Sequence, residues 1–161
     1  MQVSILYLND LEIKLLESSK LPDNLGYASL SMQLPKFLLW DFLCEGVSFQ
    51  QKDESTPHLF YSPKDWHTGN ASGTTSNEKI ANTHLDVLRT LHKALETYTG
   101  LLKQGVAPSI AIQVLPSSNV VTVAATATLP QWRKWIDVLR LNKREEYVHV
   151  ATKVKGLLDA S

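Results

Sequence analysis

Residues 101–140 read LLKQGVAPSIAIQVLPSSNVVTVAATATLPQWRKWIDVLR. We expect one helix to end at Gly105 and a short second helix to begin at Pro108 and stop at the Leu-Pro pair that follows. Residues 121–127 alternate two sets of small side chains, which predicts a strand with close packing on both faces. A tryptophan-rich helix comes next. Helices and a strand in this order predict an α+β fold.

The chain before and after this stretch supplies the other expected elements. Apolar and polar residues alternate over 27–34, as in a half-buried strand, and Pro35 then opens a helix that is apolar nearly all round. Apolar residues three or four apart predict the longest helix, from Glu78 to the glycine stop at Gly105. They form one apolar stripe: Ala81, Leu85, Leu88, Leu91, Leu95, Tyr98 and Leu102. The same spacing predicts a last helix over about residues 143–158.

Two other stretches lack a clear period. Residues 11–16 fit neither a strand nor a helix well, so both remain open. Residues 64–77 are rich in Gly, Ser and Thr and predict a flexible loop, either functional or disordered. Together the patterns predict a single α+β domain over residues 1–161, in which a small antiparallel or mixed sheet packs with several helices, one of them long and central.

Composition bounds the class of protein. The chain has 161 residues, of which 43% are apolar, enough for one sizeable core. Sixteen basic and sixteen acidic residues cancel, so we expect neither a nucleic acid nor a membrane as a partner. With one cysteine, no signal-peptide layout and no long apolar run, the sequence predicts a cytoplasmic protein without disulfides.

Short sequence motifs mark the junctions between the expected elements. They are Phe60-Tyr61-Ser62-Pro63 before the long helix, Gly105-Val106 after it, and then Leu115-Pro116 and Leu139-Arg140. In this order the elements resemble the flavin-dependent thymidylate synthases, the ThyX family, over most of the chain from Ala28 onward. The resemblance implies a ThyX-like fold, a homotetramer, a pyrimidine nucleotide such as dUMP, and FAD with NADPH and methylenetetrahydrofolate. The N-terminal part is shorter than in family members, an economy typical of a viral copy.

The chain departs from the family at its charged positions. The family's Arg-His-Arg triplet falls on Cys44, Glu45 and Gly46, and its phosphate-contacting Arg falls on Ile112. Paired guanidinium groups recognise phosphate through two parallel hydrogen bonds, so these replacements weaken the expected phosphate sites. Replacement cations are expected from lysines in or beside the long loop, namely Lys52, Lys64 or Lys79.

Four candidate site residues follow from the resemblance. It implies that Arg140 is catalytic and contacts the pyrimidine, that Glu54 and Ser55 contact the substrate, and that Arg144 faces the cofactor. For Arg140 the alternative is a surface ion pair with Asp137 or Glu145. For Arg144 the alternative is a solvated charged face at the start of the last helix, although cations there oppose the helix dipole.

Other catalytic chemistry has little support in the sequence. Five histidines are scattered without metal-ligand spacing, so we expect no metal site. Cys44 reads as a buried, inert thiol with a minor alternative as a nucleophile, and no glycine-rich phosphate loop is present. We therefore expect a divergent flavin-dependent thymidylate synthase-like enzyme that transfers one carbon to a pyrimidine nucleotide. The alternative is a non-catalytic structural, regulatory or nucleotide-binding relative.

Overall fold

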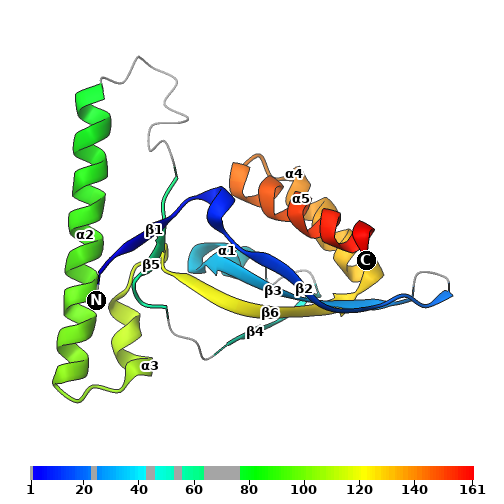
Figure 1. Cartoon of the computed structure of the whole chain (residues 1–161), viewed down its shortest axis with the longest axis horizontal. Coiled ribbons are helices and arrows are strands. Elements are labelled where there is room, and N and C mark those ends of the chain that lie inside the picture. The colour runs from blue at the N-terminus through cyan, green and yellow to red at the C-terminus, as the bar shows by residue number, and fades with distance from the viewer. Residues whose placement is uncertain (1, 23–24, 43–45, 53–55, 64–76) are drawn as a thin grey trace. The chain divides into compact units, whose positions relative to one another are not determined.

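A computed structural model gives the structure of the chain (Figure 1). It describes residues 2–22, 25–42, 46–52, 56–63 and 77–161. These residues form two compact units, each assembled from two separate stretches of the chain. The α2 unit comprises Met1–Tyr7 and Thr56–Asn119, and the sheet unit comprises Leu8–Ser55 and Val120–Ser161.

The sheet unit is built on four antiparallel strands in the order β2-β3-β6-β4. The strands are β2 (Ile13–Ser19), β3 (Tyr27–Pro35), β4 (Ser48–Gln51) and β6 (Val120–Thr128). A 3-10 turn, η1 (Leu8–Asp10), precedes β2, and three helices complete the unit: α1 (Lys36–Phe42), α4 (Leu129–Leu141) and α5 (Glu145–Ala160). Figure 1 shows α4 and α5 side by side over one face of this sheet.

The core of the sheet unit lies on that face. Every second residue of β3 and β6 points inward and is buried, from Ala28 to Leu34 on β3 and from Val121 to Ala127 on β6. The helices contribute large side chains to the same cluster, including Phe42, Trp132 and Trp135. The intervening sheet residues are small and polar, so one face is dry and the other is not.

Local interactions fix the start of α4 against β3. Thr128 and Gln131 form a capping box: the backbone N–H of Thr128 donates to Gln131 Oε1 at 3.0 Å, and the Gln131 N–H donates to Thr128 Oγ1 at 3.4 Å. The Trp132 indole N–H donates to the Ala28 carbonyl at 2.9 Å, entirely within the core. The capping box and this hydrogen bond together hold α4 in its orientation on the sheet.

The α2 unit has its own core. Two short parallel strands, β1 (Ser4–Leu6) and β5 (Leu59–Tyr61), accompany α2 (Asn77–Lys103), α3 (Pro108–Ala111) and the 3-10 turn η3 (Ile112–Val114). Its hydrophobic core cluster consists of Phe60, Leu91, Leu95, Tyr98, Ala111 and Leu115. The buried side chain of Asn119 closes the unit by donating to the carbonyls of Thr56 at 3.0 Å and Leu59 at 2.9 Å.

The structure confirms the α+β class and most expected elements. The stretch 11–16, open in the sequence, enters strand β2, and a register shift between Leu15 and Glu17 explains why its alternation was broken. Gly105 ends the region of α2 with φ +82°, as a glycine stop requires. The expectations of a single domain and of a ThyX-like fold stay predictions, and most of the expected loop, residues 64–76, lies outside the described residues.

One expected feature of the long helix is wrong in its first half. The predicted apolar stripe included Leu85, but this side chain is 48% exposed, and among the described side chains the packed cluster begins at Val87. Two elements that contact α2, α3 and η3, are short and cover only part of a 27-residue helix. No helix in the described residues is long and apolar enough to cross a membrane.

Candidate functional site

The predicted site arginines meet at the α4–α5 corner, which we define as Arg140, Lys143 and Arg144. Arg140 occupies the last turn of α4, and Arg144 is the N-cap residue of α5. Three cations lie within five positions of a chain of zero formal net charge, and Glu145 and Glu146 follow them in the first turn of α5. The guanidinium and ammonium donors of the three cations are the groups at this corner that suit an anion.

Arg144 is held by aromatic and acidic neighbours. The centre of its guanidinium lies 5.3 Å from the Phe37 ring centroid and 5.4 Å from that of Tyr147, and its Nε lies 3.7 Å from Glu146 Oε2. Both ring distances are within the range of a cation–π interaction. A solvated charged face therefore does not fully describe Arg144, because its guanidinium packs on aromatic rings of α1 and α5. Its predicted cofactor contact stays a prediction.

The aromatic support of Arg144 is itself positioned. The Tyr147 ring packs edge-on against Phe42, with centroids 5.6 Å apart, and its hydroxyl donates a hydrogen bond to Asp41. Tyr147 is buried, whereas about half of the Arg144 side chain remains exposed. The core thus fixes one side of the guanidinium and leaves its outer edge available to a ligand.

Arg140 stands in contrast to Arg144. Its side chain is exposed and forms no ion pair with Asp137 or Glu145, the two carboxylates named in the surface ion-pair alternative. Its neighbour Leu139 is buried and anchors the helix end, while Leu141 is 83% exposed. The end of α4 therefore presents a guanidinium beside an apolar side chain, the pair of groups that a nucleotide base and its charged substituents can contact.

The remaining expected site residues are placed unevenly. Glu54 and Ser55 lie outside the described residues, as do Cys44, Glu45 and Lys64. Lys52 is described, and its backbone N–H donates to the Thr122 carbonyl at 3.0 Å. The structure therefore brings Arg140 and Arg144 to one corner and leaves the other predicted contacts as predictions.

Two family positions without a cation have physical explanations in the fold. Gly46 adopts φ +78°, a left-handed conformation that costs a non-glycine residue about 1–2 kcal/mol. Ile112 is partly buried and packs its apolar side chain against the core of the α2 unit. Both positions are thus shaped by the backbone and the core rather than for phosphate recognition.

These observations bear on a bound flavin. The pyrophosphate of FAD needs fixed cations or N–H donors, and positions 46 and 112 supply no side-chain donor. These two positions therefore lack the cations that the ThyX family uses, and the predicted FAD cofactor stays a prediction.

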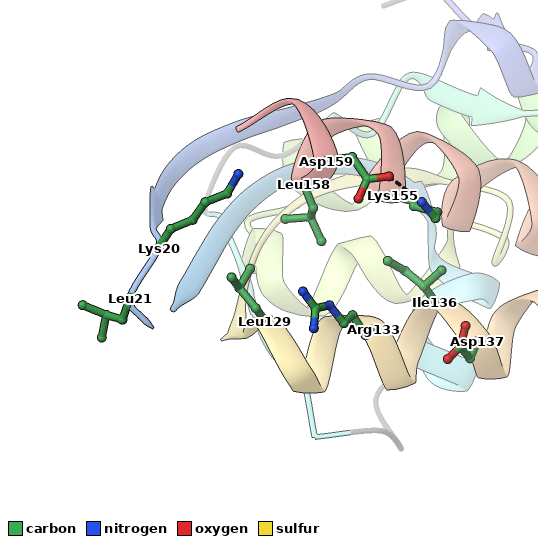
Figure 2. Close-up of a pocket in the computed structure, with 9 residues that line it drawn as sticks. All are labelled: Lys20, Leu21, Leu129, Arg133, Ile136, Asp137, Lys155, Leu158 and Asp159. Atoms are coloured by element: carbon green, nitrogen blue, oxygen red, sulfur yellow. Dashed lines mark hydrogen bonds and ion pairs between the residues drawn. The ribbon is translucent and has the colours of Figure 1, made fainter. Parts of the chain in front are cut away.

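A hollow that the sequence did not predict lies elsewhere on the sheet unit (Figure 2). We call it the α4–α5 pocket. It has a volume of about 540 Å³ and is lined by Lys20, Leu21, Leu129, Arg133, Ile136, Asp137, Lys155, Leu158 and Asp159. These residues come from the segment just after β2, from α4 and from the last turns of α5. Two i, i+4 spacings could have been read locally, that of Arg133 and Asp137 and that of Lys155 and Asp159.

Two further titratable side chains were not singled out by sequence. Burial lowers the pKa of the half-buried Lys36 ammonium at the start of α1. Burial also lowers the pKa of His149, assisted by the charge of Lys153 and opposed by that of Glu145. In the described part of the chain no three His, Cys, Asp or Glu side chains gather closely enough to hold a metal ion.

Comparison with known proteins finds solved structures that have a similar fold. No protein-family model and no curated protein matches the sequence. Among solved structures, the UMP/dUMP methylase PolB from Streptomyces cacaoi bound with 5-Br UMP matches with a TM-score of 0.82 and 16% identity, covering 99% of this chain and 92% of that chain. The chain shares the fold of this methylase.

A second structure of PolB, bound with 5-Br dUMP, matches with a TM-score of 0.74 and 17% identity, covering 98% of this chain and 93% of the other. The likeness therefore extends over nearly the whole of both chains. At this level of identity it establishes the fold and carries no residue-by-residue assignment. The resemblance to the ThyX family stays a prediction.

Proposed function

We propose that the protein binds a pyrimidine nucleoside monophosphate and methylates its base. The observation that carries the proposal is the fold match over 99% of the chain to a UMP/dUMP methylase that was crystallised with brominated pyrimidine nucleotides. A shared fold leaves chemistry open, so the proposal also depends on the residues of the α4–α5 corner.

The corner supplies groups suited to such a substrate. Arg140 is exposed and has no carboxylate partner among the described residues, so its donors are available to a pyrimidine carbonyl or a phosphate. A guanidinium at a pyrimidine carbonyl stabilises negative charge that develops in the ring when C5 acts as a nucleophile. Arg144, braced by Phe37 and Tyr147, offers a second cation with a fixed orientation. Arg140 is therefore the proposed catalytic residue.

Nucleotide binding by purified protein tests the proposal directly. We expect UMP or dUMP to bind in isothermal titration calorimetry, and Arg140→Ala to weaken binding roughly tenfold, the scale of one charge-assisted hydrogen bond. Arg89→Ala is the matched control, because Arg89 is an exposed cation of α2 whose partner is Asp86 at 3.4 Å. Equal affinities for the wild type and the Arg140→Ala variant would remove Arg140 from the site.

A non-catalytic, nucleotide-binding relative is the second candidate. The left-handed Gly46 and the partly buried Ile112 favour it, because neither position provides the cation that the flavin-dependent family uses. A flavin requirement is a separate proposal drawn from the resemblance, together with NADPH, methylenetetrahydrofolate and a homotetrameric assembly. Visible absorbance of the purified protein and its thermal shift with FAD test the cofactor, and light scattering tests the assembly. If the protein binds the nucleotide but forms no methylated product with FAD, NADPH and methylenetetrahydrofolate present, the result would support the second candidate.

A further inference from the structure

The α4–α5 pocket combines a charged rim with an apolar floor. Leu129, Ile136 and Leu158 supply apolar surface, while three cations and two carboxylates surround it. Figure 2 shows Lys20 approaching from the β2 end and Arg133 rising from α4, with Asp159 opposite them on α5. The volume of about 540 Å³ lies within the usual range for small-molecule sites.

Charge within the pocket is unbalanced toward positive. Lys155 pairs with Asp159, and its hydrogen bond lowers the pKa of the Asp159 carboxyl. The charges of Arg133 and Lys20 also lower this pKa, so both cations act on the same carboxylate. Lys20 has no hydrogen bond or ion pair with any other described residue. Three cations therefore face two carboxylates, Asp137 and Asp159, and the surplus positive charge favours a bound anion.

The pocket is also built on rigid elements. The N–H of Leu129 donates to the Gly26 carbonyl at 2.8 Å, which ties the start of α4 to the beginning of β3. Gly26 approaches the Ser19 carbonyl so closely that a Cβ would lie 1.8 Å from its oxygen. Lys20 follows Ser19, and Arg133 follows Leu129 by one helical turn. The backbone thus holds the two cations on either side of one hollow before any ligand arrives.

We propose that the α4–α5 pocket binds a small phosphate monoester with an apolar body, the phosphate between Lys20 and Arg133 and the body on Leu129, Ile136 and Leu158. A guanidinium and an ammonium together suit the several acceptor oxygens of a phosphate. Arg133 and Arg140 are seven residues apart on α4, about 10 Å along its axis. This site is separate from the proposed pyrimidine nucleotide site and does not depend on it.

An NMR titration of the full chain with phenyl phosphate tests the proposal. We expect chemical-shift changes at the amides of Leu129, Arg133 and Leu158, and we expect phenyl phosphate to bind about tenfold more tightly than inorganic phosphate. That factor corresponds to burial of roughly 50 Å² of apolar surface. No shift at these amides, or equal affinities for the two probes, would overturn the proposed site or its apolar floor.

Three variants with one control make the charge argument specific. Lys20→Ala and Arg133→Ala should each weaken phenyl phosphate binding roughly tenfold. Asp159→Asn should strengthen it severalfold, because it removes the carboxylate that competes for the same cations. Lys134→Ala removes an exposed cation of the same helix outside the pocket lining and should leave the affinity unchanged.

The contrary outcomes are equally clear. If the Lys20→Ala, Arg133→Ala and Asp159→Asn variants all bind phenyl phosphate with the wild-type affinity, the probe binds elsewhere. Displacement of phenyl phosphate by saturating UMP, together with a loss of its binding in Arg140→Ala, would overturn the separation of the two sites. A failure of UMP to bind anywhere, with phenyl phosphate still bound in the pocket, would refute the proposed function and leave this inference standing.

Discussion

Gly26 lies in the sheet unit at a position with no room for a side chain. A Cβ at this position would lie 1.8 Å from the Ser19 carbonyl oxygen, and the atom it would meet belongs to backbone that cannot swing aside. The carbonyl of Gly26 also accepts the first N–H of α4. One glycine therefore permits the β2–β3 approach and anchors the following layer of helix.

Gly26→Ala should destabilise the protein by about 1–3 kcal/mol or more, the cost of forcing backbone apart in a packed region. Urea denaturation monitored by tryptophan fluorescence measures the effect. Gly156→Ala is the matched control, because a Cβ there meets nothing within 4 Å and the residue lies inside α5. The control should stabilise the protein by roughly 0.5–1 kcal/mol. Equal stability of the two variants would show that the Ser19 contact relaxes freely.

His149 makes folding stability depend on pH. Its Nε2 is buried and has no hydrogen-bond partner among the described residues, and burial lowers the pKa of the imidazole below 6.5. Between the lowered folded pKa and the unfolded value of 6.5, the unfolded chain binds more protons. The contribution of His149 is therefore complete above pH 6.5 and is lost as the pH falls below it.

We expect the melting temperature to decrease as the pH is lowered from 7 to 5, and we expect His149→Gln to flatten that part of the profile. Thermal melts at a series of pH values provide the measurement. His84→Gln on α2 is the matched control and should leave the profile unchanged. A wild-type slope that persists in His149→Gln would assign the pH dependence to other groups.

At the scale of elements, the start of α4 decides how the helix layer sits on the sheet. Its capping box and the Trp132 hydrogen bond act within the first turn, next to the lining of the α4–α5 pocket. The sequence shows the Thr128 and Gln131 pair at the correct spacing, three apart before an apolar run. The structure adds that this turn is also held from β3 through Gly26.

Thr128→Ala should cost about 1 kcal/mol of unfolding free energy, the usual loss when an N-cap hydroxyl is removed. Because Gln131 acts through the same box, Gln131→Ala in the Thr128→Ala background should cost less than it does alone. A double-mutant cycle in urea measures the difference. Strictly additive losses would show that the two side chains stabilise α4 independently.

At the scale of the whole molecule, the chain alternates between its two units. It leaves the α2 unit after Tyr7, returns at Thr56 and leaves again after Asn119. Residues from the sequence stretch that defined the fold, 101–140, are therefore shared: its first part completes the α2 unit and its second part supplies β6 and α4. The fold likeness to PolB spans both units, because it covers 99% of the chain.

The sequence by itself determined the elements whose signals are local. Alternation predicted β3 and β6, three-to-four spacing predicted α2 and α5, and Gly105 and Pro108 predicted the break between helices. It failed at Leu85, because the burial of a helix face depends on the length of the elements that pack against it. Local period shows that one face is apolar and does not show how much of it is covered.

The candidate site divides in the same way. Arg140 and Arg144 share a corner because they lie four positions apart, and sequence sufficed to name both. Only the tertiary structure places Phe37 against Arg144, and only it brings Lys20, Arg133 and Asp159 around one hollow. Lys20 lies more than 100 positions before Arg133 and Asp159 in the sequence. Their convergence depends on how strands and helices pack, which no local periodicity encodes.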